Sequence, residues 1–484
     1  MHLFEKYFLI GLACITYAVS IAVCLRILLE NRNPAKTTSY ILIILFFPIL
    51  GLLVYFFFGI NFRTKRKFES MPAEAIIYLK QFRADIIENT RLLTSAKSEL
   101  LQHQVELTRL LLRDAYAGLT ANNTVDLLIN GENKFDKLLH DLIAAQHHIH
   151  FEYYIVENDI IGQKIKNILI QKSLQGVEVR FIYDDFGAKA IEGKYVNELR
   201  NAGVKIYPFS NINFTQLANR INYRNHRKII VIDGKTGYTG GINISDRYIN
   251  PNKNNYWRDT HLRITGDAVY WLQAHFILHY NFSSKSKLTL TDTYFPAMPK
   301  FDGALVQIAA SGPDSERATL MLAFFTAIVC ATKRVYITTP YLIPNESIVT
   351  ALKQAVLSGL DVRLLVPKNS DSFFVNAASQ SFYNELLDAG VKIYQYYKGF
   401  IHAKTVAIDN NLAIVGTANM DIRSFDLNFE INAFVYNETL NKQLTDCFLE
   451  DLKHSTLIDK HAWKKRKKRY RLVESVARLV APLL

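Results

Sequence analysis

Two long apolar runs open the chain, and they predict membrane-spanning helices. Residues 7–29 carry a single charge, Arg26, near their end, and residues 40–60 carry none. Each run is long enough to cross a hydrocarbon core of about 30 Å as a helix. We therefore expect a transmembrane hairpin over residues 1–62, kinked but not broken at Pro48. A cleaved signal peptide is the alternative for the first run, and the second run behind it disfavours that alternative.

Basic residues beside the runs predict the side of the membrane on which the rest of the chain lies. Four follow the second run and two lie in the loop between the runs, namely Arg63, Lys65, Arg66 and Lys67 against Arg32 and Lys36. Because lysine and arginine favour the cytoplasmic side, we expect both ends of the hairpin there, together with the rest of the chain.

The pattern beyond the hairpin predicts a helical linker and then a duplicated α/β fold. Residues 63–114 place apolar clusters among charges, which is typical of helices. After them, helical segments alternate with β-branched strands. Residues 199–207 resemble residues 386–394, and residues 176–180 resemble residues 359–363. We predict two homologous lobes over residues 115–290 and 300–457, each a mixed sheet packed by helices.

The carboxyl-terminal residues 458–484 hold much of the charge. The chain has 484 residues and a net charge of +13, and residues 464–471 supply seven basic side chains out of eight. An apolar stripe at helical spacing follows, formed by Leu472, Val473, Val476, Leu479, Val480, Leu483 and Leu484. A basic segment before an apolar stripe favours contact with anionic membrane lipid, with a solvated tail or a nucleic-acid patch as alternatives.

One short pattern occurs twice with identical spacing. A lysine follows a histidine by two residues, an aspartate by seven and an asparagine by seventeen; the copies are His226, Lys228, Asp233, Asn243 and His402, Lys404, Asp409, Asn419. Only 13 of 484 residues are histidine, so two copies in register argue against chance and against two ordinary basic hairpins. Two half-sites therefore predict one active site.

Each copy reads as a β-hairpin. A β-branched run after each lysine ends at a turn, with two-residue loops predicted at residues 234–235 and 410–411. This register sets each histidine opposite the asparagine of its own copy, on the face that also carries the lysine. The small Gly241 and Thr417 oppose the lysines and leave room for a ligand.

This set of side chains suits a phosphodiester. One imidazole can attack phosphorus and a second can protonate the leaving alkoxide, while lysine and asparagine stabilise the charge on the phosphate oxygens. Asp233 and Asp409 lie at the turns, so we assign them a structural or electrostatic role. The chemistry needs no metal or cofactor. The cluster His147, His148 and His150 would place only the last two on one strand face, so packing is the preferred interpretation there.

At these residues the chain resembles the phospholipase D superfamily, and with the apolar runs it resembles bacterial cardiolipin synthases over nearly its whole length. The resemblance implies that His226 is the nucleophile and His402 the acid and base. It also implies that an acidic residue downstream of each asparagine orients the histidines. Asp259 and Glu430 are the matching positions, at different intervals after their asparagines. Gly241 departs from the serine or threonine common in the superfamily.

The expected function is a membrane-bound phosphatidyltransferase of the cell (inner) membrane. The residues argue for phosphodiester exchange on lipid, and the resemblance supplies phosphatidylglycerol as donor and acceptor, with cardiolipin and glycerol as products. Three alternatives remain open: a phospholipase D-type hydrolase or transferase to another alcohol, a membrane-tethered nuclease, and a non-catalytic lipid-binding scaffold. The two apolar runs disfavour nucleic acid as a partner, and both intact His-Lys pairs disfavour a scaffold.

Overall fold

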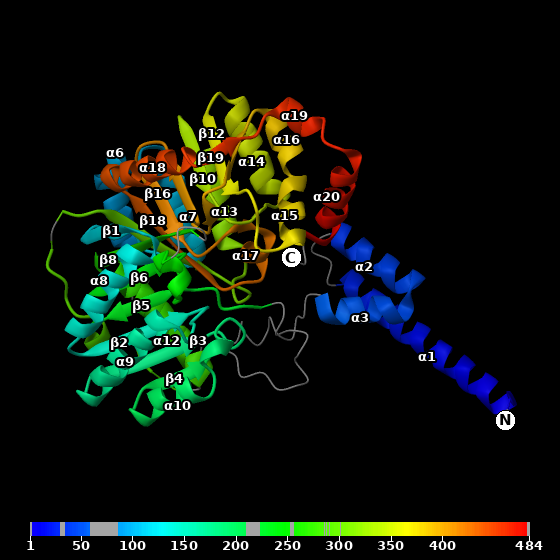
Figure 1. The fold of residues 1–484 in the computed structure, drawn as a ribbon, viewed down its shortest axis with the longest axis horizontal. Helices are drawn as coiled ribbons and strands as arrows, with labels where there is room; N and C mark the ends of the chain where they lie inside the picture. Colours follow the sequence, from blue (N-terminus) through cyan, green and yellow to red (C-terminus); the bar gives the residue numbers. More distant parts are fainter. Residues whose placement is uncertain are drawn as a thin grey trace. The chain divides into compact units, whose positions relative to one another are not determined.

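The computed structural model describes residues 2–29, 34–58, 86–209, 223–251, 256–284, 286, 288–289, 291–300 and 302–481. The chain divides into two compact units (Figure 1). One comprises Met1–Lys65 with Ile212–Asn222, and the other comprises Arg66–Asn211 with Tyr223–Leu484.

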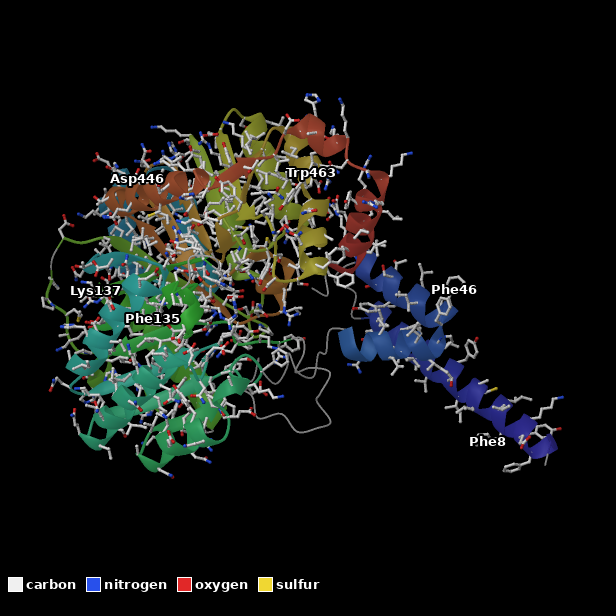
Figure 2. All side chains as sticks on the ribbon, in the orientation of Figure 1. Phe8, Phe46, Phe135, Lys137, Asp446 and Trp463 are labelled. Atoms are coloured by element: carbon white, nitrogen blue, oxygen red, sulfur yellow. The ribbon has the colours of Figure 1, made fainter. Side chains whose placement is uncertain are left out.

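The first unit is built on three apolar helices. They are α1 (His2–Leu29), α2 (Pro34–Phe46) and α3 (Pro48–Phe58). Among the described helices, only α1 has an apolar stretch long enough to cross a membrane, Phe4–Leu29. Its apolar side chains, such as Phe8, stand out from the helix and are mostly exposed (Figure 2). The first predicted span is thus a helix of suitable length and composition.

The second predicted span is not one continuous helix. The helix ends at Phe46 and a new one begins at Pro48. The rings of Tyr40 and Tyr55 lie 5.5 Å apart, so α3 folds back on α2. A Cβ on Gly51 would lie 2.5 Å from the Cα of Ile44, which explains why a glycine stands at this crossing. At 1.5 Å per residue, α2 and α3 are about 20 and 17 Å long, each shorter than a hydrocarbon core.

The second unit contains two large mixed sheets. The first has seven strands in the order β1-β8-β6-β5-β2-β3-β4, and the second has the order β9-β18-β16-β15-β10-β12-β13-β19. The first sheet consists of β1 (Asn123–Ile129), β8 (Thr260–Gly266), β6 (Thr236–Gly240), β5 (Ile229–Ile232), β2 (His148–Tyr153), β3 (Glu178–Tyr183) and β4 (Lys205–Pro208). The second consists of β9 (Leu305–Ser311), β18 (Glu430–Tyr436), β16 (Leu412–Gly416), β15 (Thr405–Ile408), β10 (Arg334–Thr338), β12 (Asp361–Pro367), β13 (Lys392–Tyr396) and β19 (Ser455–Leu457).

Position by position, seven strands of one sheet repeat the order of the other, so the predicted pair of homologous α/β lobes is confirmed. Helices complete each lobe. The first has α8 (Asn130–Ala144), α9 (Ile160–Leu174), α10 (Lys194–Asn201) and α12 (Val269–Ser284). The second has α13 (Thr319–Val329), α14 (Glu346–Leu357), α15 (Phe373–Ser381), α16 (Tyr383–Ala389), α17 (Ile422–Asp426) and α18 (Glu438–Leu452). Asparagine or aspartate caps start several of them; Asp159, for example, accepts from the Gly162 amide at 3.0 Å.

A shared apolar core joins the lobes. One cluster of fully buried side chains draws Val231 and Leu262 from the first sheet and Val415 and Ile431 from the second. Helices α12 and α18 contribute to the same cluster, for instance through Phe276. Each lobe has a further core on the other face of its sheet. Because this burial is common to both sheets, the lobes form one folding unit.

The predicted linker and tail are both partly folded onto the second lobe. Residues 86–96 are helical and are followed by α6 (Ser98–Leu101) and α7 (Val105–Ala115), whose Leu107 and Leu111 are buried in the core of that lobe. Residues 63–85 lie outside the described part. The tail forms α19 (Lys460–Lys464) and α20 (Lys468–Val480), and α20 packs against α15 (Figure 1).

Candidate active site

Both motif hairpins form, one residue out of the predicted register. In the first lobe Ile232 pairs with Thr236, and in the second Ile408 pairs with Leu412. Each loop thus has three residues instead of two, and its aspartate takes a positive φ, 54° at Asp233 and 49° at Asp409. The prediction that each histidine lies opposite the asparagine of its own copy is therefore wrong. Each asparagine instead lies beyond the end of its hairpin strand.

The two motif aspartates hold the backbone at the start of a neighbouring strand. Asp233 accepts hydrogen bonds from the amides of His147 and His148 at 2.7 and 2.9 Å, and from that of Gln146. Asp409 accepts from three successive amides in the same way, those of Thr332, Lys333 and Arg334. These contacts give both carboxylates a structural role and place them at the far end of the hairpins from the histidines.

The segments that carry the histidines bond to the opposite lobe. The amide of His226 donates to the Phe429 carbonyl at 3.0 Å, and the amide of His402 donates to the Arg258 carbonyl at 2.7 Å. The second crossing is extended by β7 (Tyr256–Arg258), which pairs in parallel with β14 (Gly399–Ile401). His226 is thus fixed beside Phe429, the residue before Glu430. His402 is fixed beside Arg258, the residue before Asp259.

Each imidazole is bound by a carboxylate from the other lobe. Nδ1 of His226 lies 2.9 Å from both oxygens of Glu430, and Nδ1 of His402 lies 2.7 Å from Oδ2 of Asp259. Both carboxylates are fully buried. Since Nδ1 is occupied, Nε2 of each ring is the atom left to react. The structure brings all four of these residues into two matched pairs, and the crossing between lobes is a feature that spacing alone did not predict.

The two lysines lie close to the histidines and to each other. Lys228 donates to the His226 carbonyl at 2.9 Å, and Lys404 donates to the His402 carbonyl at 2.6 Å. Burial lowers the pKa of Lys228 to about 7, and the charge of Lys404 lowers it further. Burial likewise lowers the pKa of Lys404 to about 8. The effect of Lys404 on the pKa of Lys228 indicates that the two side chains lie near each other, and two such donors suit an anion.

Burial also keeps both histidines neutral near pH 7. Desolvation lowers the pKa of His226 to about 4, although the charge of Glu430 opposes the shift. The pKa of His402 is lowered to about 4 by burial and by its own lysine, with Asp259 opposing. A neutral imidazole has the free electron pair that a nucleophile or base needs. A phosphodiester anion placed between the rings would raise both pKa values, because negative charge favours the protonated form.

The positions after each hairpin support the carboxylates and the rings. A Cβ on Gly241 would lie 2.1 Å from Oδ1 of Asp259, so this glycine makes room for the carboxylate; the prediction that it makes room for a ligand is wrong. In the other lobe the Thr417 hydroxyl accepts from the Ile431 amide at 2.9 Å. Asn243 donates to the Tyr248 hydroxyl at 2.9 Å.

The second asparagine is placed differently. The backbone amide of Asn419 donates to the Ser424 hydroxyl at 3.1 Å. Its side-chain oxygen is buried without a hydrogen-bond partner in the described structure. An unpaired buried oxygen beside a reaction centre is costly unless a ligand donates to it. The two asparagines, alike in sequence, therefore have different surroundings.

Aromatic rings around the histidines were missed by the sequence reasoning. Tyr154 lies edge-on to His226 at 4.9 Å, and three rings surround His402: Tyr248 at 5.9 Å, Trp257 at 5.7 Å and Phe400 at 6.0 Å. A signal did exist for two of them. Trp257 lies two residues before Asp259, and Phe400 lies two residues before His402, so strand alternation places each ring on the same side as a site residue. The histidine cluster is structural: His148 and His150 are buried and both bond to Gln273.

A duplicated α/β lobe with two His-Lys hairpins around one anion site defines the phospholipase D superfamily. A family described as "Cardiolipin synthase, PLD-like domain" matches residues 138–277 and 324–452, and one described as "Phospholipase_D-nuclease N-terminal" matches residues 18–59.

Full-length relatives point the same way. A cardiolipin synthase of Geobacillus kaustophilus is 43% identical over 98% of this chain and 94% of its own length. The major cardiolipin synthase ClsA of Bacillus subtilis is 39% identical over 94% of this chain and 95% of its own. The solved phosphatidylserine synthase of Haemophilus influenzae shares the fold with a TM-score of 0.60, at 13% identity, over 78% of this chain and all of that one. The chain belongs to the cardiolipin synthase family and is a phosphatidyltransferase of the phospholipase D superfamily.

Proposed function

We propose that the chain makes cardiolipin and glycerol from two phosphatidylglycerol molecules, through a phosphatidyl group held on His226. The observation that carries the proposal is the pair of crossed bonds from Nδ1 of His226 to Glu430 and from Nδ1 of His402 to Asp259. Each bond fixes one imidazole, and the charge of each lysine acts on the histidine of the other motif, which supports a single site built from both lobes.

In the first step Nε2 of His226 attacks the phosphorus of the donor lipid. A bond from nitrogen to phosphorus forms, and the bond from phosphorus to the glycerol oxygen breaks. His402 takes up a proton when the anionic phosphodiester binds, and it gives that proton to the departing glycerol. Lys228 and Lys404 stabilise the negative charge on the phosphate oxygens as it builds up.

The second step reverses the first with a new alcohol. A hydroxyl of the second phosphatidylglycerol gives its proton to His402 and attacks the same phosphorus, and His226 leaves as a neutral imidazole. Glu430 stabilises the positive charge that the ring of His226 carries in the intermediate, and Asp259 stabilises the positive charge of His402 while that ring is protonated, before the first step and after the second.

The experiment is to trap the intermediate. Protein incubated with phosphatidylglycerol labelled at phosphorus is quenched in base, where a phosphoramidate survives, and the labelled peptide is identified. We expect the label on His226, lost in His226→Ala and kept in His402→Asn. Label on His402 would reverse the two roles. Product analysis with the same lipid separates the activities, since phosphatidic acid alone would indicate a hydrolase.

We also propose that the catalytic body lies on the cytoplasmic side of the cell membrane. The support is the number of basic residues that follow the second apolar run, residues 63–67. The broken second helix makes this testable. If only α1 crosses, the amino terminus lies on the opposite face from the body; if the chain crosses twice, both share a face. Protease-accessible tags at the amino terminus and in the connector at residues 296–300, probed in intact cells, distinguish the two cases.

A further inference from the structure

Helix α20 presents its apolar side away from the protein. Leu472, Val476 and Leu479 form one stripe, and their exposed fractions are 67%, 53% and 81%. A helix docked on a soluble domain normally buries such a stripe. Among the described side chains of α20, the buried ones are Glu474 and Ala477.

The inward face of α20 is held by polar contacts, which fix its orientation. Ala477 is buried against the second lobe. Glu474 receives two bonds from Arg466, at 2.6 and 3.1 Å. Arg478 binds Glu385 of α16 at 2.7 Å. Because these contacts engage the polar face, the apolar stripe is left outward by the docking itself.

The neighbouring helix extends the same apolar surface. Phe373 and Phe374, in the first turn of α15, are 70% and 58% exposed. Helices α15 and α20 pack together (Figure 1). We call the five side chains Phe373, Phe374, Leu472, Val476 and Leu479 the apolar patch. Patches of this kind mark a binding surface more often than an ordinary exterior.

Positive charge adjoins the apolar patch. The segment between α19 and the stripe exposes five cations, Lys465, Lys467, Lys468, Arg469 and Arg471. Two other cations of the segment are engaged within the protein: Lys464 with Asp388, and Arg466 with Glu474. Apolar side chains beside exposed cations are complementary to a bilayer with anionic headgroups.

A short path connects the apolar patch with the active site. Asp371, two residues before Phe373, accepts a hydrogen bond from the Tyr341 hydroxyl at 2.7 Å. The Tyr341 ring lies 6.4 Å from Phe400, and Phe400 lies 6.0 Å from His402. The start of α15 is therefore linked to His402 through the side chains of Tyr341 and Phe400.

We propose that α15 and α20 form a docking surface that inserts the apolar patch into an anionic lipid bilayer beside the active site. The surface is formed by other helices than α1, and with it in the bilayer a lipid could reach the His402 side of the site without crossing water. The proposal rests on the proposed function only for its activity readout.

The direct test measures depth in the membrane with the full-length protein. Phe374→Trp is reconstituted in phosphatidylglycerol vesicles with and without brominated acyl chains. The matched control is Leu357→Trp, at the end of α14, where the exposed fraction is 75% against 58% for Phe374. After subtraction of the three native tryptophans, we expect bromolipid to quench the indole introduced by Phe374→Trp at least threefold more than the control indole.

Two outcomes of the quenching experiment would overturn the proposal. The first is equal quenching of both introduced indoles by acrylamide in water, which would place the apolar patch in solvent. The second is protection of the Phe374→Trp indole from both quenchers. Protein would then cover the patch, either a second copy or the chain's own amino-terminal helices.

The functional test replaces the stripe. The triple variant Leu472→Ser, Val476→Ser, Leu479→Ser should form cardiolipin at least fivefold more slowly in vesicles, with an unchanged rate on water-soluble short-chain phosphatidylglycerol and an unchanged thermal midpoint. Leu357→Ser should match the unmodified protein in both assays. A triple variant as fast as the unmodified protein in vesicles would contradict docking. If the unmodified protein makes no cardiolipin, the proposed function fails while the quenching result still decides the docking.

Discussion

The carboxylate behind each histidine is the residue-scale feature most open to test. Glu430→Gln keeps the size and a hydrogen-bond partner but removes the charge that stabilises protonated His226. We expect kcat to fall by roughly 10³-fold or more, as when an amide replaces the carboxylate behind a catalytic histidine. Asp446→Asn, at an exposed carboxylate on α18 (Figure 2), is the control and should leave kcat unchanged. Cardiolipin formation from labelled phosphatidylglycerol measures both; a Glu430→Gln enzyme within tenfold of the unmodified one would refute the role.

Lowered lysine pKa values predict how anion binding depends on pH. In the free site burial holds the pKa of Lys228 at about 7, and that of Lys404 at about 8. A bound phosphodiester favours the charged form and raises both, so binding takes up protons. We expect the Kd for glycerophosphoglycerol, whose charge is constant from pH 6 to 10, to increase as pH rises above 7.

Titration calorimetry checks the sign. Affinity should be full below pH 7 and decline through pH 8 and above, because a neutral lysine must then gain a proton to bind. Lys228→Arg keeps its charge throughout this range and should flatten the profile. A Kd that is constant from pH 6 to 9 in the unmodified protein would contradict the lowered pKa values.

At the residue scale the sequence predicted that histidines pair with carboxylates. It did not predict that each pair joins residues of different lobes. The repeated spacing of His226 and His402 was enough to predict two half-sites. Asp259 lies 143 residues from His402, and Glu430 lies 204 from His226. No local pattern reports which of two distant carboxylates binds which ring, since that depends on how the sheets pack.

Among the elements, the first hairpin ends where Gly241 gives space to a carboxylate. Gly241→Ala would place a Cβ 2.1 Å from Oδ1 of Asp259, so the carboxylate must shift and its bond to His402 must lengthen or break. We expect kcat to drop at least 100-fold, with about 1–3 kcal/mol of lost stability from overpacking. Thr417→Ala at the equivalent position only removes a hydroxyl and should cost activity far less. Equal losses in both would argue against the steric explanation.

The turn aspartates should affect stability more than chemistry. Asp409→Ala leaves three amides without their acceptor, which costs about 1–3 kcal/mol for buried groups. We expect a lower thermal midpoint in detergent and a kcat within about threefold of the unmodified value for the fraction that stays folded. Asp409→Asn retains one acceptor oxygen and the tolerance for positive φ, so it should lie in between. A large loss of kcat without a change in midpoint would assign the carboxylate to the chemistry instead.

The elements also show where pattern reasoning reaches its limit. Residues 40–60 have the same hydropathy whether the helix continues or folds back, so the run could not distinguish α2 and α3 from one kinked span. Pro48 and Gly51 were the available signals for the break. The hairpin register shifted by one because a third loop residue, Asp233 or Asp409, accepts positive φ while bonding to a neighbouring strand. For α20 the pattern predicted the stripe and favoured its contact with lipid, but it did not predict that the helix would pack against α15.

For the whole molecule, the shared core predicts that the two lobes stay associated after the chain between them is cleaved. A protease site inserted in the connector at residues 296–300 should leave activity within about twofold after cleavage, because burial common to both sheets keeps the halves together. Each half, when expressed alone, should be inactive, since its histidine then lacks the carboxylate that the other half supplies. Gel filtration followed by the cardiolipin assay measures both effects. Activity in an isolated half would contradict the crossed arrangement.

At the largest scale the sequence was most informative. Similar segments at residues 199–207 and 386–394 predicted the duplication, and the two sheets share one strand order. The alternation of helices and strands was sufficient to predict two similar lobes, because local periodicity sets it in each half. The sequence did not predict how the two lobes face each other, since the segments that pair there, β7 and β14, share no pattern.

The crossed carboxylates also bear on how such a chain can arise. A polypeptide equal to one half would carry an imidazole and, elsewhere on its surface, an acid suited to a neighbour's imidazole. Two identical copies related by a twofold axis would satisfy both at once. After fusion of the copies into one gene, each half binds a different half, so the two sequences no longer need to be identical. Thr417 in the place of Gly241, and Glu430 in the place of Asp259, are the kind of differences that such freedom permits.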